Sequence, residues 1–85
     1  MKPTYNHQLI AEALNKHTRE KFEYRDESET FVSKNYEVTE IEMFIFEVSA
    51  LTYDRDTGAT NEFLIDTGLT LADAIDAIRK DKGEL

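Results

Sequence analysis

Residues 37–53 read Glu-Val-Thr-Glu-Ile-Glu-Met-Phe-Ile-Phe-Glu-Val-Ser-Ala-Leu-Thr-Tyr and form the longest apolar, β-branched and aromatic stretch of the chain. This composition is typical of β-strands, and the stretch is predicted to be the central strand. Because strand side chains alternate between two faces, one face is expected to pack in the core through Ile41, Met43 and Ile45. The other face would be partly acidic and partly apolar, with Glu40, Glu42, Phe44, Phe46 and Val48.

A β-hairpin is predicted directly after this stretch. Residues 54–60 read Asp-Arg-Asp-Thr-Gly-Ala-Thr, and Gly58 suits the positive φ of a bulged hairpin turn. Asn61–Asp66 is the expected returning strand. Its side chains divide between two faces, with Phe63 and Ile65 on one and Glu62 and Leu64 on the other.

Helices are predicted near both ends of the chain. The first extends from about Asn6 to Arg19, with Thr4 or Asn6 as its cap. Its apolar stripe at helical spacing is Leu9, Ile10, Ala13, Leu14 and His17. The second follows Thr70, which with Asp73 approximates a capping box, and it ends at Gly83. Its buried stripe is expected to be Leu71, Ala74, Ile75, Ala77 and Ile78.

The segment between the first helix and the central strand is less regular. Residues 21–25 alternate like a short strand or a frayed end of the helix, and residues 30–33 form a second short apolar piece before a turn at Lys34-Asn35. The whole chain, residues 1–85, is therefore predicted to be one α+β domain. The expected architecture is a two-layer sandwich of α-β-β(-β)-α order, in which two helices cover one face of an antiparallel sheet of three or four strands. The opposite face is expected to be open, unless the residues around Phe22, Tyr24 and Phe31 fold over it.

Charge is concentrated in one part of the chain. The formal net charge is −8, and residues 37–66 hold eight acidic side chains against the single Arg55, a net of −7. Phosphate contacts require Lys and Arg, so direct binding of this region to nucleic acid or to an anionic membrane is disfavoured. A compact acidic region would instead attract a basic protein.

Motifs for catalysis or metal binding are not evident. The chain has no Cys, and His7 and His17, ten positions apart on a helix, would be separated by about 15 Å. Asp54 and Asp56 precede Gly58 as in an EF-hand loop, but the Gly falls one place early and Ile65 occupies the position of the final Glu. A non-enzymatic protein without metal or cofactor is therefore expected. The absence of Cys and of a signal-like or membrane-spanning segment favours the cytoplasm.

The leading functional hypothesis is an inhibitor or regulator that occupies the basic surface of a nucleic-acid-handling protein. It would act as a DNA mimic of the kind that phages and mobile elements encode, because carboxylates at i and i+2 on a strand, about 7 Å apart, can follow a row of basic side chains. The expected contact residues are Glu37, Glu40, Glu42, Phe44, Phe46, Glu47, Asp54, Asp56 and Glu62. The alternative is a self-associating structural module, a homodimer whose two-fold apolar patch contains Phe44, Phe46, Val48 and Leu64. The edge of the last strand is another route by which two copies would pair.

Overall fold

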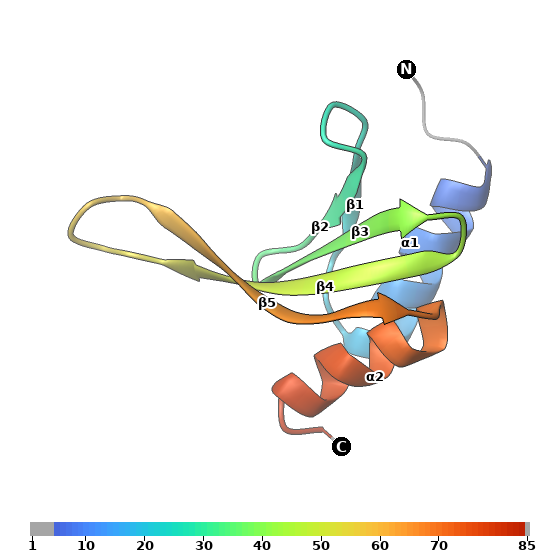
Figure 1. The fold of residues 1–85 in the computed structure, drawn as a ribbon. Coiled ribbons are helices and arrows are strands. Elements are labelled where there is room, and N and C mark those ends of the chain that lie inside the picture. Colours follow the sequence, from blue (N-terminus) through green and yellow to red (C-terminus); the bar gives the residue numbers. More distant parts are fainter. Residues whose placement is uncertain (1–4, 85) are drawn as a thin grey trace.

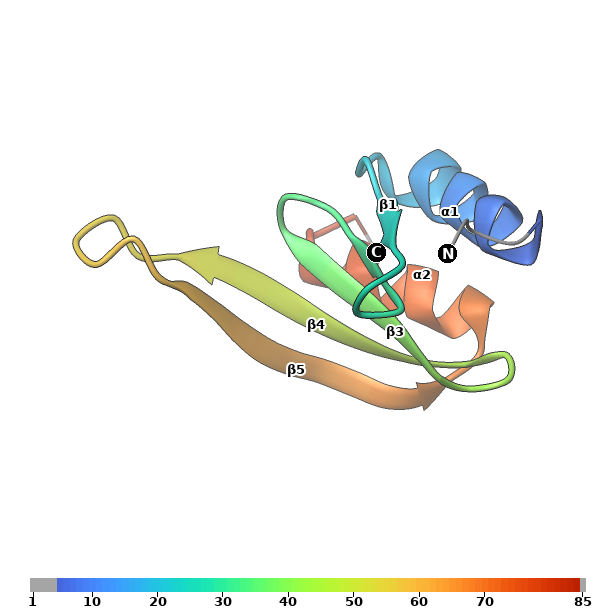
Figure 2. The same cartoon turned by 90° about the horizontal axis from the view of Figure 1, so that it is seen from above.

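The computed structural model describes residues 5–84. The elements in chain order are α1 (Tyr5–Thr18), β1 (Glu23–Arg25), β2 (Thr30–Val32), β3 (Tyr36–Glu42), β4 (Ile45–Tyr53), β5 (Thr60–Leu69) and α2 (Leu71–Asp81). The five strands form one antiparallel sheet in sequential order (Figure 1). Both helices lie on the same face of this sheet (Figure 2). The predicted α+β sandwich is confirmed, whereas the predicted number of strands is wrong.

The stretch predicted to be one central strand is in fact a hairpin. β3 and β4 are joined by a turn at Met43-Phe44. Phe44 has a φ of 61°, in the left-handed region that usually favours Gly or Asn. Its N–H donates a hydrogen bond of 2.9 Å to the carboxylate of Glu40, which stabilises the turn. The pattern indicates a continuous strand because neither Met nor Phe is a turn residue.

The irregular segment before β3 supplies the two remaining strands. Tyr24 of β1 pairs with Phe31 of β2, which in turn pairs with Val38 of β3. Phe22 and Phe31 are buried in the core, and the ring of Tyr24 stacks on His7 of α1 with centroids 4.0 Å apart. These side chains therefore pack on the helix side and do not cover the opposite face of the sheet.

The core lies between the two helices and the sheet. Its buried hydrophobic members are Ile10, Leu14, Phe22, Phe31, Tyr36, Val38, Phe46, Val48, Ala74, Ile75 and Ile78. Phe46 is 1% exposed, whereas Met43 is 80% exposed and Ile41 is also exposed. The predicted faces of the central stretch are therefore reversed. The reason is that Glu40 and Glu42, the acids that suggested an exposed face, lie at the turn end of β3, whereas Phe46 and Val48 of the same predicted face are covered by the helices.

The predicted stripe of α1 is partly wrong. Ile10, Leu14 and Thr18 are buried, at a spacing of four residues, whereas Leu9 and His17 are exposed. The predicted cap Thr4 lies outside the described residues, and Asn6 lies within the helix.

The predicted ends of α2 are confirmed, and so is most of its buried stripe, in which Leu71 and Ala77 are only partly buried. The side chain of Thr70 accepts a hydrogen bond of 3.1 Å from the backbone of Asp73, and Ala74, Ile75 and Ile78 are buried. At the other end Gly83 has a φ of 80°. Its N–H donates to Lys80, and the next N–H donates to Arg79, which is the hydrogen-bond pattern of a Schellman motif.

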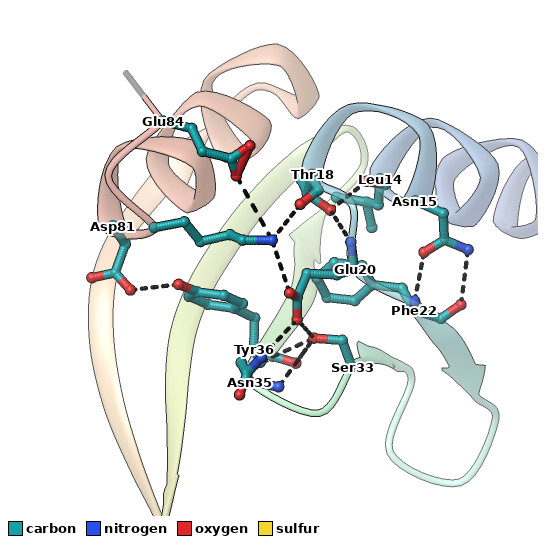
Figure 3. Close-up of polar contacts among 11 residues, drawn as sticks. Leu14, Asn15, Thr18, Glu20, Phe22, Ser33, Asn35, Tyr36, Asp81 and Glu84 are labelled. Carbon is teal, nitrogen blue, oxygen red and sulfur yellow. Dashed lines mark hydrogen bonds and ion pairs between the residues drawn. The ribbon is translucent and has the colours of Figure 1, made fainter.

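A polar cluster connects the ends of both helices to the β2–β3 turn (Figure 3). Lys82 lies 2.9 Å from one carboxylate oxygen of Glu20 and also donates to the carbonyl of Thr18. The other oxygen of Glu20 accepts hydrogen bonds from Ser33 at 2.9 Å and Asn35 at 3.3 Å. Burial alone would raise the pKa of Glu20, but the hydrogen bonds from Lys82 and Ser33 and the charge of Lys82 hold it below its ordinary 4.5. This cluster fixes the C-terminal part of the chain on the sheet.

Candidate functional site

Three of the predicted contact residues lie together on the face away from the helices. Glu37 of β3 pairs with Ser49 of β4, Glu47 lies two residues before Ser49, and Glu62 of β5 pairs with Leu51, two residues after it. All three carboxylates therefore surround Ser49 on one face of the sheet. We refer to Glu37, Glu47 and Glu62 as the open-face cluster.

The charges of the open-face cluster repel one another. Burial raises the pKa of Glu37, and the neighbouring charges of Glu62 and Glu47 raise it further. Within the described part of the chain, none of the three carboxylates pairs with a basic side chain. The fold therefore tolerates an unfavourable concentration of negative charge on this face.

Apolar side chains border the open-face cluster. Strand alternation and register place Leu51, Tyr53 and Leu64 on the same face. Tyr53 is 69% exposed and Leu64 is 59% exposed. The ends of β4 and β5 extend beyond the other strands as a projecting hairpin (Figures 1 and 2). Acidic and apolar groups are therefore available together to a partner. Leu51 and Tyr53 were not predicted as contact residues, although they continue the alternate positions of Glu47 and Ser49, which indicates a shared face.

A second group of predicted residues lies at the β3–β4 turn. Glu40, Glu42 and Phe44 border a hollow of about 420 Å³ beside the first turns of α1. Glu40 pairs with Phe46, so it belongs to the helix side of the sheet. Its carboxylate accepts a hydrogen bond from the backbone N–H of Phe44 in the turn. The structure therefore does not bring this group into the open-face cluster.

A third group lies at the far end of the projecting hairpin. The carboxylate of Asp54 accepts hydrogen bonds from the backbone of Asp56 at 2.8 Å and of Thr57 at 3.4 Å. Gly58 has a φ of 73°, so the predicted hairpin turn is confirmed. Asp54 serves to build this turn, and Asp56 remains exposed. In residues 5–84, no group of three or more His, Asp or Glu side chains is placed to hold a metal ion.

The remaining predicted contact residue, Phe46, is contradicted by the structure. Its ring is buried beneath the helices with Val48, so neither side chain reaches the surface. The reversal of the two faces removes Phe46 from the predicted interaction site and both side chains from the predicted two-fold patch.

We compared the chain with protein-family models, with curated proteins and with solved structures, and none of the three comparisons finds a match. Neither helix of the described residues has the length and apolar composition needed to cross a membrane.

Replacing Glu37 by Gln is expected to stabilise the fold at pH 7 by roughly 0.5 kcal/mol, because it removes a charge that is disfavoured first by burial and then by repulsion from the neighbouring strands. When folding raises the pKa of a carboxyl group, the fold becomes less stable as the pH rises from the ordinary pKa of 4.5 through the pKa of the folded state. The stability that Glu37→Gln gains over the wild-type chain should therefore disappear below pH 4.5. Thermal unfolding at pH 7 and pH 3.5 measures this, and an advantage that is equal at both values would contradict the assigned cause.

Proposed function

We propose that this chain is a non-enzymatic inhibitor or regulator that binds a basic surface of a nucleic-acid-handling protein. The observation that carries the proposal is the open-face cluster, in which three carboxylates share one uncovered sheet face and have no basic partner among residues 5–84. Lys or Arg side chains placed among these carboxylates would relieve their repulsion. The cluster therefore gains more from a basic partner than isolated surface acids would.

The class of partner follows from the distribution of charge. A net charge of −7 over residues 37–66 would steer a positively charged protein to this part of the molecule. The basic grooves of nucleic-acid-handling proteins ordinarily contact phosphates. Carboxylates on adjacent strands can take the place of those phosphates, which supports a DNA-mimic mode of inhibition. Tyr53 and Leu64 would supply the apolar contacts that acidic groups lack.

Removing two charges from the open-face cluster is expected to weaken binding. The test variant is Glu37→Gln with Glu62→Gln, and the matched control is Glu12→Gln with Glu27→Gln, two exposed acids outside the cluster. Proteins captured from a lysate by the wild-type chain are identified, and each purified partner is titrated with all three forms. The test variant should bind at least about 10-fold more weakly, while the control should remain within about 2-fold.

Equal losses in both variants would show that only the net charge matters and would count against the open-face cluster. Captured proteins without basic surfaces or any connection to nucleic acids would overturn the proposed class of partner.

The structure weakens the self-association alternative in the form predicted from the sequence. Its two-fold patch required Phe44, Phe46, Val48 and Leu64 on one surface, and two of these four side chains are buried. Only Phe44 and Leu64 are exposed, and they belong to different parts of the sheet.

A further inference from the structure

We propose that the basic partner contributes an extended segment that pairs with the free edge of β5 and becomes a sixth strand of the sheet. This inference rests on the proposed function, because it specifies how a basic partner is engaged. β5 is the last strand in the sheet order, so its outer edge has no neighbouring strand among the described residues. Strand addition at such an edge is a recurring mode of peptide recognition.

The backbone of β5 is regular where it is most exposed. Residues 60–64 pair without interruption with residues 53–49 of β4. The N–H of Asp54 donates to the carbonyl of Ala59, and antiparallel pairs alternate between bonded and non-bonded. Asn61 and Phe63 therefore face β4. The N–H and C=O groups of Thr60, Glu62 and Leu64 point outward, where an incoming strand can bond with them.

Side chains on both faces favour a segment that is basic and apolar. On the open face, alternate residues of an added strand would lie beside Glu62 and Leu64. On the helix side, the others would lie beside Phe63, which is 58% exposed, and near a groove of about 790 Å³ between β5 and α2. Its lining includes Ile65 and Leu69 together with Asp66, Asp73 and Asp76.

The edge of β5 selects against a second copy of the same chain. Natural edge strands are often protected by Lys, Pro or bulges. Residues 60–69 contain neither Lys nor Pro, and both register shifts between β4 and β5 lie beyond residue 64. Protection over residues 60–64 therefore comes from negative charge, since Glu62 and the nearby acids repel another β5. A basic segment does not meet that repulsion.

The test uses two synthetic peptides and the intact chain. The first is an acetylated and amidated decapeptide of alternating Lys and Val, and the second is identical except that three alternate residues are N-methylated along one edge. N-methylation removes backbone donors and obstructs strand pairing but retains every charge. Fluorescence titration should show binding of the unmodified peptide and at least about 100-fold weaker binding of the methylated one, the equivalent of three lost hydrogen bonds.

A pair of protein variants locates the contact. Glu62→Gln and Glu62→Pro lose the same charge, but only the second loses the outward N–H, a change that edge strands tolerate. The Pro variant should bind the unmodified peptide about 5–10-fold more weakly than the Gln variant. Circular dichroism melting establishes that both are folded, and the methylated peptide tests the same contact on the wild-type chain.

Equal affinity for both peptides would overturn strand addition, and so would the absence of binding to either. Sedimentation of the chain alone as a dimer would also overturn it, since a second copy would then occupy the edge. In each case the proposed function is judged separately, by titrating the captured partner with the Glu37→Gln and Glu62→Gln variant.

Discussion

Replacing Phe46 by Ala is expected to lower the free energy of unfolding by about 3–5 kcal/mol. The ring is 1% exposed and belongs to the core cluster between the helices and the sheet. Its removal leaves a cavity in a domain of only 85 residues, whose total stability is of similar size. The variant should therefore be largely unfolded under conditions in which the wild-type chain is folded. Urea denaturation followed by circular dichroism measures the difference.

Phe44 provides the matched control for this experiment, since it has the same side chain two positions earlier. Its ring is 61% exposed at the β3–β4 turn, so Phe44→Ala should cost less than about 1 kcal/mol. Equal destabilisation by the two substitutions would mean that both rings pack in the core, which would contradict the observed reversal of the faces.

The parts of the fold that the sequence predicts correctly are those that local chemistry determines. Gly58 marks the β4–β5 turn because it adopts positive φ without steric cost. Thr70 and Gly83 mark the ends of α2 because their capping interactions lie within a few residues. Such signals do not depend on the rest of the molecule.

The strand count depends on features that the sequence pattern does not contain. The β3–β4 turn is formed by Met43 and Phe44, and its stability comes from the side chain of Glu40 instead of from turn residues. β1 and β2 contain three residues each, which is too short for alternation to distinguish a strand from a loop.

The candidate site could be predicted only in part. Glu37, Glu47 and Glu62 are visible in the sequence as acids within strand-like stretches, but their proximity depends on the register of three strands. The two faces could have been assigned from the whole stretch, because Tyr36, Val38, Phe46 and Val48 all occupy even-numbered positions, which lie on one face of a strand. The structure buries all four side chains. The acids at Glu40 and Glu42 obscure that pattern because they lie at the turn end of β3, beside the hollow at the first turns of α1.

Replacing Lys82 by Met is expected to destabilise the fold by about 2–4 kcal/mol at pH 7, because it leaves the carboxylate of Glu20 without its cation. The Glu20 side chain is only 8% exposed, so water cannot fully solvate its carboxylate once the ion pair with Lys82 is lost. The carbonyl of Thr18 also loses the hydrogen bond that Lys82 donates. Chemical denaturation of the wild-type chain, the single variant and the Lys82→Met, Glu20→Gln double variant gives the coupling between the two side chains.

The pH dependence of these variants identifies the cause of the loss. In the wild-type chain the pKa of Glu20 lies below 4.5, so its stabilising contribution is complete above pH 4.5 and is lost as the pH falls through the folded value. Without Lys82, neither its hydrogen bond nor its charge opposes the effect of burial, so the pKa of Glu20 should be higher than in the wild-type chain. The single variant should then gain stability relative to the wild type as the pH is lowered from 7 to 4.

The double variant, which has no carboxylate at this position, should recover part of the loss at pH 7. A deficit in the single variant that is the same at both pH values would show that Lys82 acts through packing and its bond to Thr18, and not through the charge of Glu20.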